Sequence, residues 1–566
     1  MEKESVFIYK LIFFVYNHGE TTTFLKELMP QDAFTLRLNA MELNSTLSGG
    51  KINKINQPER EEVTFLIYTG KKVLKLALNV NASDCGVYFS EAVRENPAVA
   101  PNFCMLLRKH LQNAEIKEVS LVGFERILAF RFYCASDFTA TEKILYAEIM
   151  GKYSNLVLTE NGVILGALKT TSVGENNKRL ILTGAKYALP QPQDKVDPTD
   201  YPALFELLQT APSDELAQFL FRRVRGIAPV TAENIVKCYG GGIFAKHVYD
   251  YLFSNEITAC VTEHDFLARW EDGATLFPTL SAAQAYFYHK RRTQKGFELL
   301  KHKLQSAVQS AIKKQEKRLQ QITQKQADCK DMELDRIKGE LLTANLWRIE
   351  RGAKGCELEN YYGEGTIQIL LDPTRSPSDN AQSYFKRYRK EKRTMEALAP
   401  QEEETRREIE YLASLLACVE FARDTDDLAA LEEELVTTGI LKVQAAKKKK
   451  ETLAPFRTFE KDGFRILMGR NNLENDKLVR SSRPEDIWLH TKAYHSSHVV
   501  IKTEGKAVSE EVLLYAAKLC AQYSAGKGDK VAVDYCQIKF VKKPPKSKAG
   551  FVIYTDYKTL LVNPNA

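Results

Sequence analysis

Two long, charged stretches with a helical repeat of apolar residues constrain the fold of this chain more than any other feature. The first begins near residue 282 and the second lies between 409 and 435. Apolar residues at spacings of three, four or seven give each stretch one narrow apolar stripe, as in the seam of a coiled coil. The stripes consist of Leu300, Leu304, Val308, Ile312, Leu319 and Ile322, and of Ile409, Leu412, Leu416, Val419, Leu428, Leu431 and Leu435.

These stretches predict an arm rather than another globular domain. The chain would run out along one helix, form a small tip around 340–385, and return along the second helix as an antiparallel coiled coil. The tip segment contains a glycine turn, a strand, and a helix start that Ser378 or Asp379 could cap. A compact helical bundle is the alternative. The sequence offers no third long apolar helix, which favours the arm.

The arm separates regions whose short strands and turns indicate α+β domains. With 566 residues the chain is too long for a single core, so several domains are expected. The expected order is an extra segment before a natural start at Met29, an N-terminal domain, a helical region, the arm and a C-terminal α+β domain. Their expected bounds are 1–28, 29–175, 176–281, 282–455 and 456–566.

The composition excludes several classes of protein. The ten cysteines are scattered and form no C-x-x-C pair, which argues against a zinc finger and a disulfide framework. A reducing cytosol fits this usage. The apolar stretch FIYKLIFFVY at 7–16 is too short for a membrane span, which needs about 20 residues, and no signal-peptide cleavage site follows it. We therefore expect no membrane association.

The segment FLFRRVRGIAPVTAENIVKCYG has the layout of a helix-hairpin-helix unit. Two helical stretches flank a turn at Gly226, Ile227 and Ala228, and Thr231 could cap the second helix. Such a hairpin offers backbone N–H groups and a helix N-terminus to a phosphate. Because Ala228 replaces the usual second glycine, an ordinary helical turn stays open as the alternative.

The stretch DIWLHTKAYHSSHVVI at 486–501 holds three histidines, two serines and a tryptophan. A zinc site would need a tightly folded loop, and a serine hydrolase would need a G-x-S-x-G elbow that is missing. A polar and aromatic surface for a sugar-phosphate backbone is favoured, and strand alternation places Trp488 and His490 on one face. Trp488 as an ordinary core residue stays open. The candidate residues are Asp486, Trp488, His490, Lys492, Ser497 and His498.

A lysine-rich loop follows in the same domain. The segment QIKFVKKPPKSKAG at 537–550 places five lysines around a Pro-Pro turn. Lysines on such a stiffened loop predict phosphate contacts that depend on salt but not on base sequence. The candidates are Lys539, Lys542, Lys543, Lys546 and Lys548.

The order of the segments resembles that of the NFACT family, and within it the bacterial RqcH group, also called fibronectin-binding protein A. The resemblance covers nearly all of 29–566. The segments that carry it are NFCMLLRKHL, EIMGKYSNLVL, GELLTANLWRIERG, ELENYY, SPSDNAQSYFKRYRK, GRNNLENDKLV, DIWLHTK, SHVVI, VDYCQIKFVKKP and GFVIYT.

The resemblance implies a multidomain α+β protein with a glycosylase-like N-terminal domain, a helix-hairpin-helix region, a coiled-coil arm and a C-terminal RNA-binding domain. It implies a cytoplasmic factor for ribosome quality control, without cofactor or metal and without catalysis of its own. The implied partners are the large ribosomal subunit with peptidyl-tRNA, alanyl-tRNA, ribosomal RNA and a small S4-type RNA-binding protein. The implied outcome is a template-free alanine tail on the stalled chain, which marks that chain for degradation.

The resemblance also implies site residues in the N-terminal domain. The Asp-Arg pair of the family falls at Glu125 and Arg126, where glutamate keeps the charge and adds a methylene. Asp32 takes the place of an early family aspartate, followed by Ala33 instead of glycine. The residues expected to contact tRNA or support tailing are Asp32, Arg108, Lys109, Glu125, Arg126, Glu148 and Lys152.

Two alternative functions stay open. The N-terminal domain of the family is similar to that of formamidopyrimidine glycosylases, and Pro30 would supply an N-terminal secondary amine if Met29 were the start. However, the next residue is Gln31 rather than glutamate, and a four-cysteine zinc finger is missing. A surface adhesin that binds fibronectin is the second alternative, although no secretion signal or wall anchor is present in the sequence.

Overall fold

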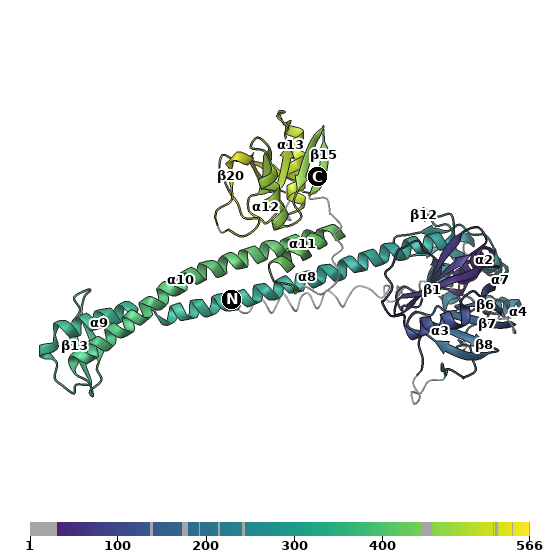
Figure 1. Cartoon of the computed structure of the whole chain (residues 1–566), viewed down its shortest axis with the longest axis horizontal. Helices are drawn as coiled ribbons and strands as arrows, with labels where there is room; N and C mark the ends of the chain where they lie inside the picture. The colour runs from purple at the N-terminus through teal and green to yellow at the C-terminus, as the bar shows by residue number, and fades with distance from the viewer. Residues whose placement is uncertain are drawn as a thin grey trace. The chain divides into compact units, whose positions relative to one another are not determined.

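Figure 1 shows the computed structural model of the chain. The chain divides into two compact units, with the boundary between Thr293 and Gln294. The structure describes residues 31–135, 140–171, 179–191, 193–212, 215–239, 244–442, 456–524, 526, 530–545 and 547–564. The expectations for residues 1–28, Met29, Pro30 and Lys546 fall outside these ranges.

A nine-stranded antiparallel sheet forms the frame of the first unit. Its order is β4-β3-β2-β1-β5-β6-β7-β8-β9. Tight turns at Thr69-Gly70 and at Asn161-Gly162 join neighbouring strands, and Gly70, Asn161 and Gly162 have positive φ. The strands are β1 (Lys51–Glu59), β2 (Glu62–Tyr68), β3 (Val73–Asn79), β4 (Gly86–Phe89), β5 (Glu115–Leu121), β6 (Ile127–Ala135), β7 (Ala140–Glu148), β8 (Asn155–Glu160) and β9 (Val163–Ala167).

Two helices share the main core of this sheet. They are α2 (Ala33–Leu47) and α3 (Asn102–Leu111), whose apolar residues pack with those of the strands. Leu43 of α2 and Leu107 of α3 are fully buried with Phe65 and Phe130 of the sheet. Burying a side chain of this size stabilises the fold by about 1.5–3 kcal/mol.

A second core joins the N-terminal domain to the helical region. It contains Ala33, Phe34 and Leu38 of α2 together with apolar residues of the helices between residues 201 and 288. The region predicted as a separate domain at 176–281 therefore shares a core with its neighbour. Its elements are α4 (Tyr201–Gln209), α5 (Leu216–Arg223), α6 (Pro229–Tyr239), α7 (Ala245–Phe253), β10 (Cys260–Val261), β11 (Phe266–Leu267), β12 (Thr275–Leu276) and the start of α8 (Leu280–Asp328).

The second unit contains two long helices that pack side by side (Figure 1). Leu304 and Val308 of α8 lie in one apolar cluster with Leu412 and Leu415 of α10 (Pro377–Phe421). The predicted tip consists of α9 (Met332–Ala344) and a hairpin of β13 (Gly355–Glu359) and β14 (Thr366–Leu370). Within the described helices none has both the length and the apolar character of a membrane span.

Two expectations for the arm are corrected. The second apolar run is not one helix, because α10 ends at Phe421 and a further helix, α11 (Thr425–Thr437), starts after the capping residue Asp424. The helix after the tip is capped by Ser376, two residues before the predicted cap. The Ser376 hydroxyl accepts the Asp379 N–H at 3.1 Å, and a proline fills the first helical position, as is common there.

The C-terminal domain has a six-stranded antiparallel sheet of order β15-β16-β18-β17-β19-β22. Helix α13 (Glu510–Gln522) contributes to the apolar core on one face, and a separate cluster around Trp488 includes Leu478 of α12 (Asn472–Ser481). The strands are β15 (Arg457–Lys461), β16 (Phe464–Met468), β17 (Ile487–Thr491), β18 (Val499–Lys502), β19 (Val531–Gln537) and β22 (Lys558–Val562), with a short pair β20 (Val541–Lys542) and β21 (Ile553–Tyr554).

Candidate functional site

Asp32 connects the start of α2 to the hairpin turn between α5 and α6. One carboxylate oxygen accepts the Thr35 N–H at 2.8 Å and so caps α2. The other accepts the Ala228 N–H at 2.9 Å and the Thr231 hydroxyl at 2.6 Å. Asp32 is only 3% exposed. Its carboxylate therefore holds two segments together and does not face a ligand.

The hairpin turn packs inward. Gly226 has φ +75°, and a Cβ at this position would lie 2.6 Å from a ring atom of Phe124 and 2.7 Å from Cβ of Ala33. Ile227 and Ala228 are buried. Two helices around a turn were predicted correctly, but the Ala228 N–H bonds Asp32 and is not open to a phosphate. Thr231 does not cap α6 as expected, because its hydroxyl donates to Asp32.

Glu125 and Arg126 lie next to this turn and are both partly exposed. Arg225 Nε approaches a Glu125 oxygen at 3.7 Å, while its guanidinium also pairs with Asp197 at 3.1 Å. Burial lowers the pKa of Arg126, and the carboxylates of Asp32 and Glu125 act in the opposite direction. Burial raises the pKa of Glu125 against the effect of Arg225. The result is a partly desolvated guanidinium, which is a strong partner for a phosphate oxygen.

Glu148 lies at the end of β7, one strand away from Arg126, and is 1% exposed. It accepts two hydrogen bonds from Arg179, at 2.9 and 2.5 Å, and one from the Tyr187 hydroxyl at 2.9 Å. Such a bidentate pair fixes the geometry of both side chains. A direct contact between Glu148 and tRNA, as expected from the sequence, is contradicted by this burial.

The remaining cationic residues predicted in the N-terminal domain differ in exposure and in their contacts with the rest of the protein. Arg108 in the last turn of α3 donates from Nε to the Ile55 carbonyl at 2.8 Å, so its guanidinium is partly held by β1. Lys109 is exposed. Lys152 is also exposed, in a short 3₁₀ helix at Gly151–Tyr153 where its Nζ lies 5.0 Å above the Tyr153 ring. Lys109 and Lys152 are therefore open to solvent.

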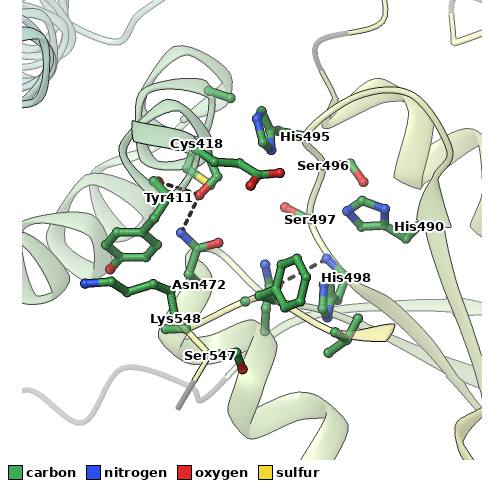
Figure 2. A pocket seen from close by; sticks show the side chains of 18 of the residues that line it. Tyr411, Cys418, Asn472, His490, His495, Ser496, Ser497, His498, Ser547 and Lys548 are labelled. Atoms are coloured by element: carbon green, nitrogen blue, oxygen red, sulfur yellow. Dashed lines mark hydrogen bonds between the residues drawn. The ribbon is translucent and has the colours of Figure 1, made fainter. Parts of the chain in front are cut away.

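In the second unit, a cavity of about 1090 Å³ lies between α10 and the C-terminal domain (Figure 2). Trp488, His490, Ser497 and His498 from the stretch at 486–501 all line it. Part of the stretch predicted as a surface for RNA therefore lines a cavity. The other walls come from α10, from Asn472 at the start of α12, and from the loop before β21.

The two predicted histidines are held neutral. Burial lowers the pKa of His490 to about 4, with His495 adding to the effect and Asp534 opposing it. Burial also places the pKa of His498 well below its ordinary value, and His490 adds to this shift. Trp488 is fully buried. Of the two interpretations left open by the sequence, this burial favours an ordinary core residue over a ring that stacks on an exposed base.

Asp486 is a structural carboxylate. It is 1% exposed and accepts hydrogen bonds from Lys502 Nζ at 2.9 Å and from the N–H groups of Arg483 and Thr503. Burial alone would raise the pKa of Asp486, but these hydrogen bonds, led by that of Lys502, outweigh it and lower the pKa. A direct RNA contact by this carboxylate is contradicted by its burial.

The predicted lysines separate into two groups. Lys543 pairs with Asp476, and Lys548 pairs with Glu408 of α10, so both charges have partners inside the protein. Lys539 and Lys542 are exposed, and no ion pair to either is found in the described residues. Lys492 is exposed with its Nζ 5.4 Å above the Tyr557 ring. In the described ranges, no group of three or more His, Cys, Asp or Glu side chains could hold a metal ion.

Comparison with known proteins decides the family. The family described as NFACT N-terminal and middle domains matches residues 32–453, and the NFACT protein RNA binding domain matches residues 454–553. The chain belongs to the NFACT family. The wall of the cavity formed by Trp488, His490 and His498 is thus part of the NFACT RNA binding domain.

Full-length relatives support this assignment. The protein named Rqc2 homolog RqcH from Bacillus subtilis (strain 168) is 33% identical over 93% of this chain and 96% of its own length. The protein of the same name from Streptococcus suis (strain 05ZYH33) is 32% identical over 95% of this chain and 98% of its own length.

A comparison with solved structures found a likeness to the N-terminal part of the fibronectin/fibrinogen-binding protein from Streptococcus suis. That structure is 28% identical, covers 46% of this chain and 99% of that chain, and has a TM-score of 0.43.

Sequence reasoning missed the polar contacts that join the NFACT RNA binding domain to the helices before it. Glu434 of α11 is fully buried and accepts the Tyr411 hydroxyl at 2.6 Å and the Asn472 N–H at 3.0 Å. Asn471 donates to the Ala430 carbonyl at 2.5 Å. The segment GRNNLENDKLV carried part of the resemblance, and these asparagines are the signal that could have found the contact.

Proposed function

We propose that this NFACT protein acts in ribosome-associated quality control in the cytoplasm. It binds the large ribosomal subunit that still carries peptidyl-tRNA after a stall. The observation that carries this proposal is the 33% identity to Rqc2 homolog RqcH of Bacillus subtilis over 93% of this chain and 96% of the relative. A match over nearly the whole of both proteins covers every domain, not one shared module.

We further propose that the protein recruits alanyl-tRNA and supports a template-free alanine tail. The bond would be formed by the RNA of the ribosome, and this chain would contribute position, which can itself lower a barrier greatly. Arg126 is the proposed tRNA contact because its guanidinium is partly exposed and partly desolvated. Asp32 and Glu148 then support the site from inside, and the exposed Lys109 and Lys152 add positive charge.

The RNA binding domain is proposed to hold ribosomal RNA. Lys492, Lys539 and Lys542 are exposed and can contact phosphates. Phosphate contacts of this kind position a protein without reading the base sequence. Subunit binding should therefore depend on the second unit, while tailing should also need Arg126.

This division of roles is tested by Arg126→Ala. Cells that contain only this variant should lose alanine tails on stalled chains, as measured by mass spectrometry of their C-termini. Co-sedimentation of the variant with large subunits should stay near the wild-type level, because the second unit is unchanged.

Arg131→Ala is the matched control. Arg131 lies on β6 of the same domain and pairs with Glu118 and Glu142 at the surface, so its loss should leave tails intact. Wild-type tails in the Arg126→Ala strain would contradict the role of Arg126. Absence of the wild-type protein from large-subunit fractions of stalled cells would contradict the proposed function as a whole.

A further inference from the structure

The cavity of the second unit has a polar but uncharged lining on its C-terminal side. Six residues give it hydrogen-bonding groups without a net charge, and Figure 2 labels Asn472, His490, Ser496, Ser497 and His498 around the open space. These residues are Asn472, Asn475, His490, Ser496, Ser497 and His498.

Several charged residues of the cavity have ion-pair partners in the chain, whereas Glu404, Glu410 and Lys492, which also line it, have no ion pair within the described residues. Arg457 pairs with Asp427, Arg470 pairs with Glu474 at 3.2 Å, and Lys548 pairs with Glu408. Burial lowers the pKa of the partly exposed His490 to about 4 and that of the buried His498 well below its ordinary value, so both imidazoles are neutral at pH 7. A neutral imidazole has one donor and one acceptor. The C-terminal wall of the cavity therefore suits a neutral group that has both donors and acceptors.

Two buried polar atoms of the wall lack a hydrogen-bond partner within the described part of the chain. They are Nε1 of Trp488, whose side chain is fully buried, and Nδ1 of His498, which is 2% exposed. A buried donor without a partner costs free energy unless a ligand supplies the acceptor. The Trp488 N–H can only donate.

Four aromatic and imidazole rings of the wall pack against one another. The Trp488 and His490 rings are parallel within 1° and their centroids are 5.7 Å apart. The His498 ring stands at 89° to the first and 90° to the second, 5.3 Å from each. Tyr554 lies 4.8 Å from Trp488. The rings of Trp488 and His490 thus stand perpendicular to the His498 imidazole, whose Nδ1 has no hydrogen-bond partner in the described residues.

We infer that this cavity receives one unstacked nucleobase, which hydrogen-bonds at the wall of Trp488, His490 and His498 while its phosphate remains near the exposed Lys492. A nucleobase is planar and neutral and has donors and acceptors on its edge, which are the properties that this wall complements. Proteins recognise unpaired RNA bases in this way, with aromatic stacking and hydrogen bonds to the base edge. The inference rests on the proposed function, since the ribosome supplies the unpaired RNA. A free nucleotide shares the same chemistry.

The test uses the full chain and a fluorescein-labelled single-stranded RNA of eight adenosines, with binding followed by fluorescence polarisation at fixed salt. The matched ligand has the same ribose-phosphate backbone but no bases. The wild-type protein should bind the adenosine oligomer about tenfold more tightly than the abasic one, as expected for one stacked and hydrogen-bonded base. Trp488→Phe keeps a ring but removes the unpaired N–H, and it should remove most of this difference.

A second variant avoids changes in the core. Ser547→Phe places a ring in the cavity from a partly exposed loop position and should also abolish the preference for bases. Ser306→Phe, at an exposed position of α8, is its control and should bind like the wild type. Competition by AMP alone at the affinity of the oligomer would assign the cavity to free nucleotides, and much weaker competition would assign it to RNA.

The inference is overturned if the wild-type protein binds both oligomers equally, or if Ser547→Phe keeps the full preference for bases. Co-sedimentation with large subunits is measured on the same proteins. A protein that binds the subunit but shows no base preference contradicts only the inference, whereas one that never binds the subunit contradicts the proposed function.

Discussion

Two groups of buried polar side chains, one in each unit, differ in their hydrogen bonds. In the first unit, the carboxylates of Asp32 and Glu148 are almost fully buried, and each accepts three hydrogen bonds from its own chain. In the cavity of the second unit, Trp488 and His498 are equally buried, yet each leaves one nitrogen without a partner in the described residues. A satisfied carboxylate is part of the frame, whereas an unsatisfied neutral donor indicates a place for a ligand.

This difference changes which residues should matter for RNA. Charged residues within motifs are the natural candidates for RNA contacts when only the sequence is known. However, Asp32, Glu148 and Asp486 are buried, so we expect them to support the fold around the contact residues. The contacts are expected from Arg126, which is only partly buried, and from exposed lysines. Three predictions test the contrast between the fully hydrogen-bonded carboxylates of the first unit and the partly unbonded rings of the cavity in the second unit.

The largest effect is expected for Asp32→Ala. The change leaves the N–H groups of Thr35 and Ala228 and the Thr231 hydroxyl buried without their acceptor. Each hydrogen bond to a charged group contributes about 1.5–3 kcal/mol, so the first unit should lose at least about 3 kcal/mol of its free energy of unfolding. Urea denaturation, followed by hydrogen exchange of peptides from α2 and α6, measures this loss.

Asp200→Ala is the control for Asp32→Ala. Asp200 caps α4 with one hydrogen bond to the Ala203 N–H at 3.2 Å, at an exposed position. Loss of such a cap should cost only about 1 kcal/mol. If both variants lost the same stability, Asp32 would be an ordinary helix cap and its link to the hairpin turn would contribute nothing.

The local structure was largely predictable from the sequence, but its long-range consequences were not. Alternation in DIWLHT correctly paired Trp488 with His490 on one face of β17, as their parallel rings show. It could not show that both faces of this strand are covered, because Leu489 and Trp488 belong to different apolar clusters. A period-two pattern states which residues share a face, not what packs on it.

The same limit applies to the first site. Asp32 and Ala228 are 196 residues apart, and no spacing rule connects them. The hairpin turn was recognised from its glycine and proline, but its inward packing depends on Phe124 and Ala33, which carry no motif. Residues with a local signature were found, while the partners that give them their roles come from elsewhere in the chain.

The second prediction concerns pH and the cavity. Because burial lowers the pKa of His490 from 6.5 to about 4, the unfolded chain binds the proton more readily between these values. The stability contributed by neutral His490 is therefore complete above pH 6.5 and is lost as the pH falls toward 4, by roughly 2–3 kcal/mol. His490→Gln should flatten this part of the curve of unfolding free energy against pH.

His264→Gln is the control for the pH prediction, because its side chain is 73% exposed. In urea titrations between pH 7 and 4.5, the unfolding free energy of this variant should change with pH as it does for the wild type. The contribution of Asp486 is common to all three proteins, whereas His490 itself adds to the pKa shift of His498. The difference between the curves therefore reports His490 together with its effect on His498. Parallel curves for wild type and His490→Gln would show that this imidazole is not kept neutral by the fold.

The smallest effect is expected from the lysines of the loop, where paired and unpaired charges can be compared directly. Changing Lys539 and Lys542 to glutamine should weaken binding to purified large subunits and reduce the slope of log K against log salt by about 1.5, because each lost phosphate contact removes about 0.7–0.9. The same change at Lys543 and Lys548 should reduce the slope less, since Asp476 and Glu408 already hold these charges. Equal slopes for the two double variants would mean that these ion pairs open when the protein meets RNA, and the distinction between satisfied and available charges would not extend to this surface.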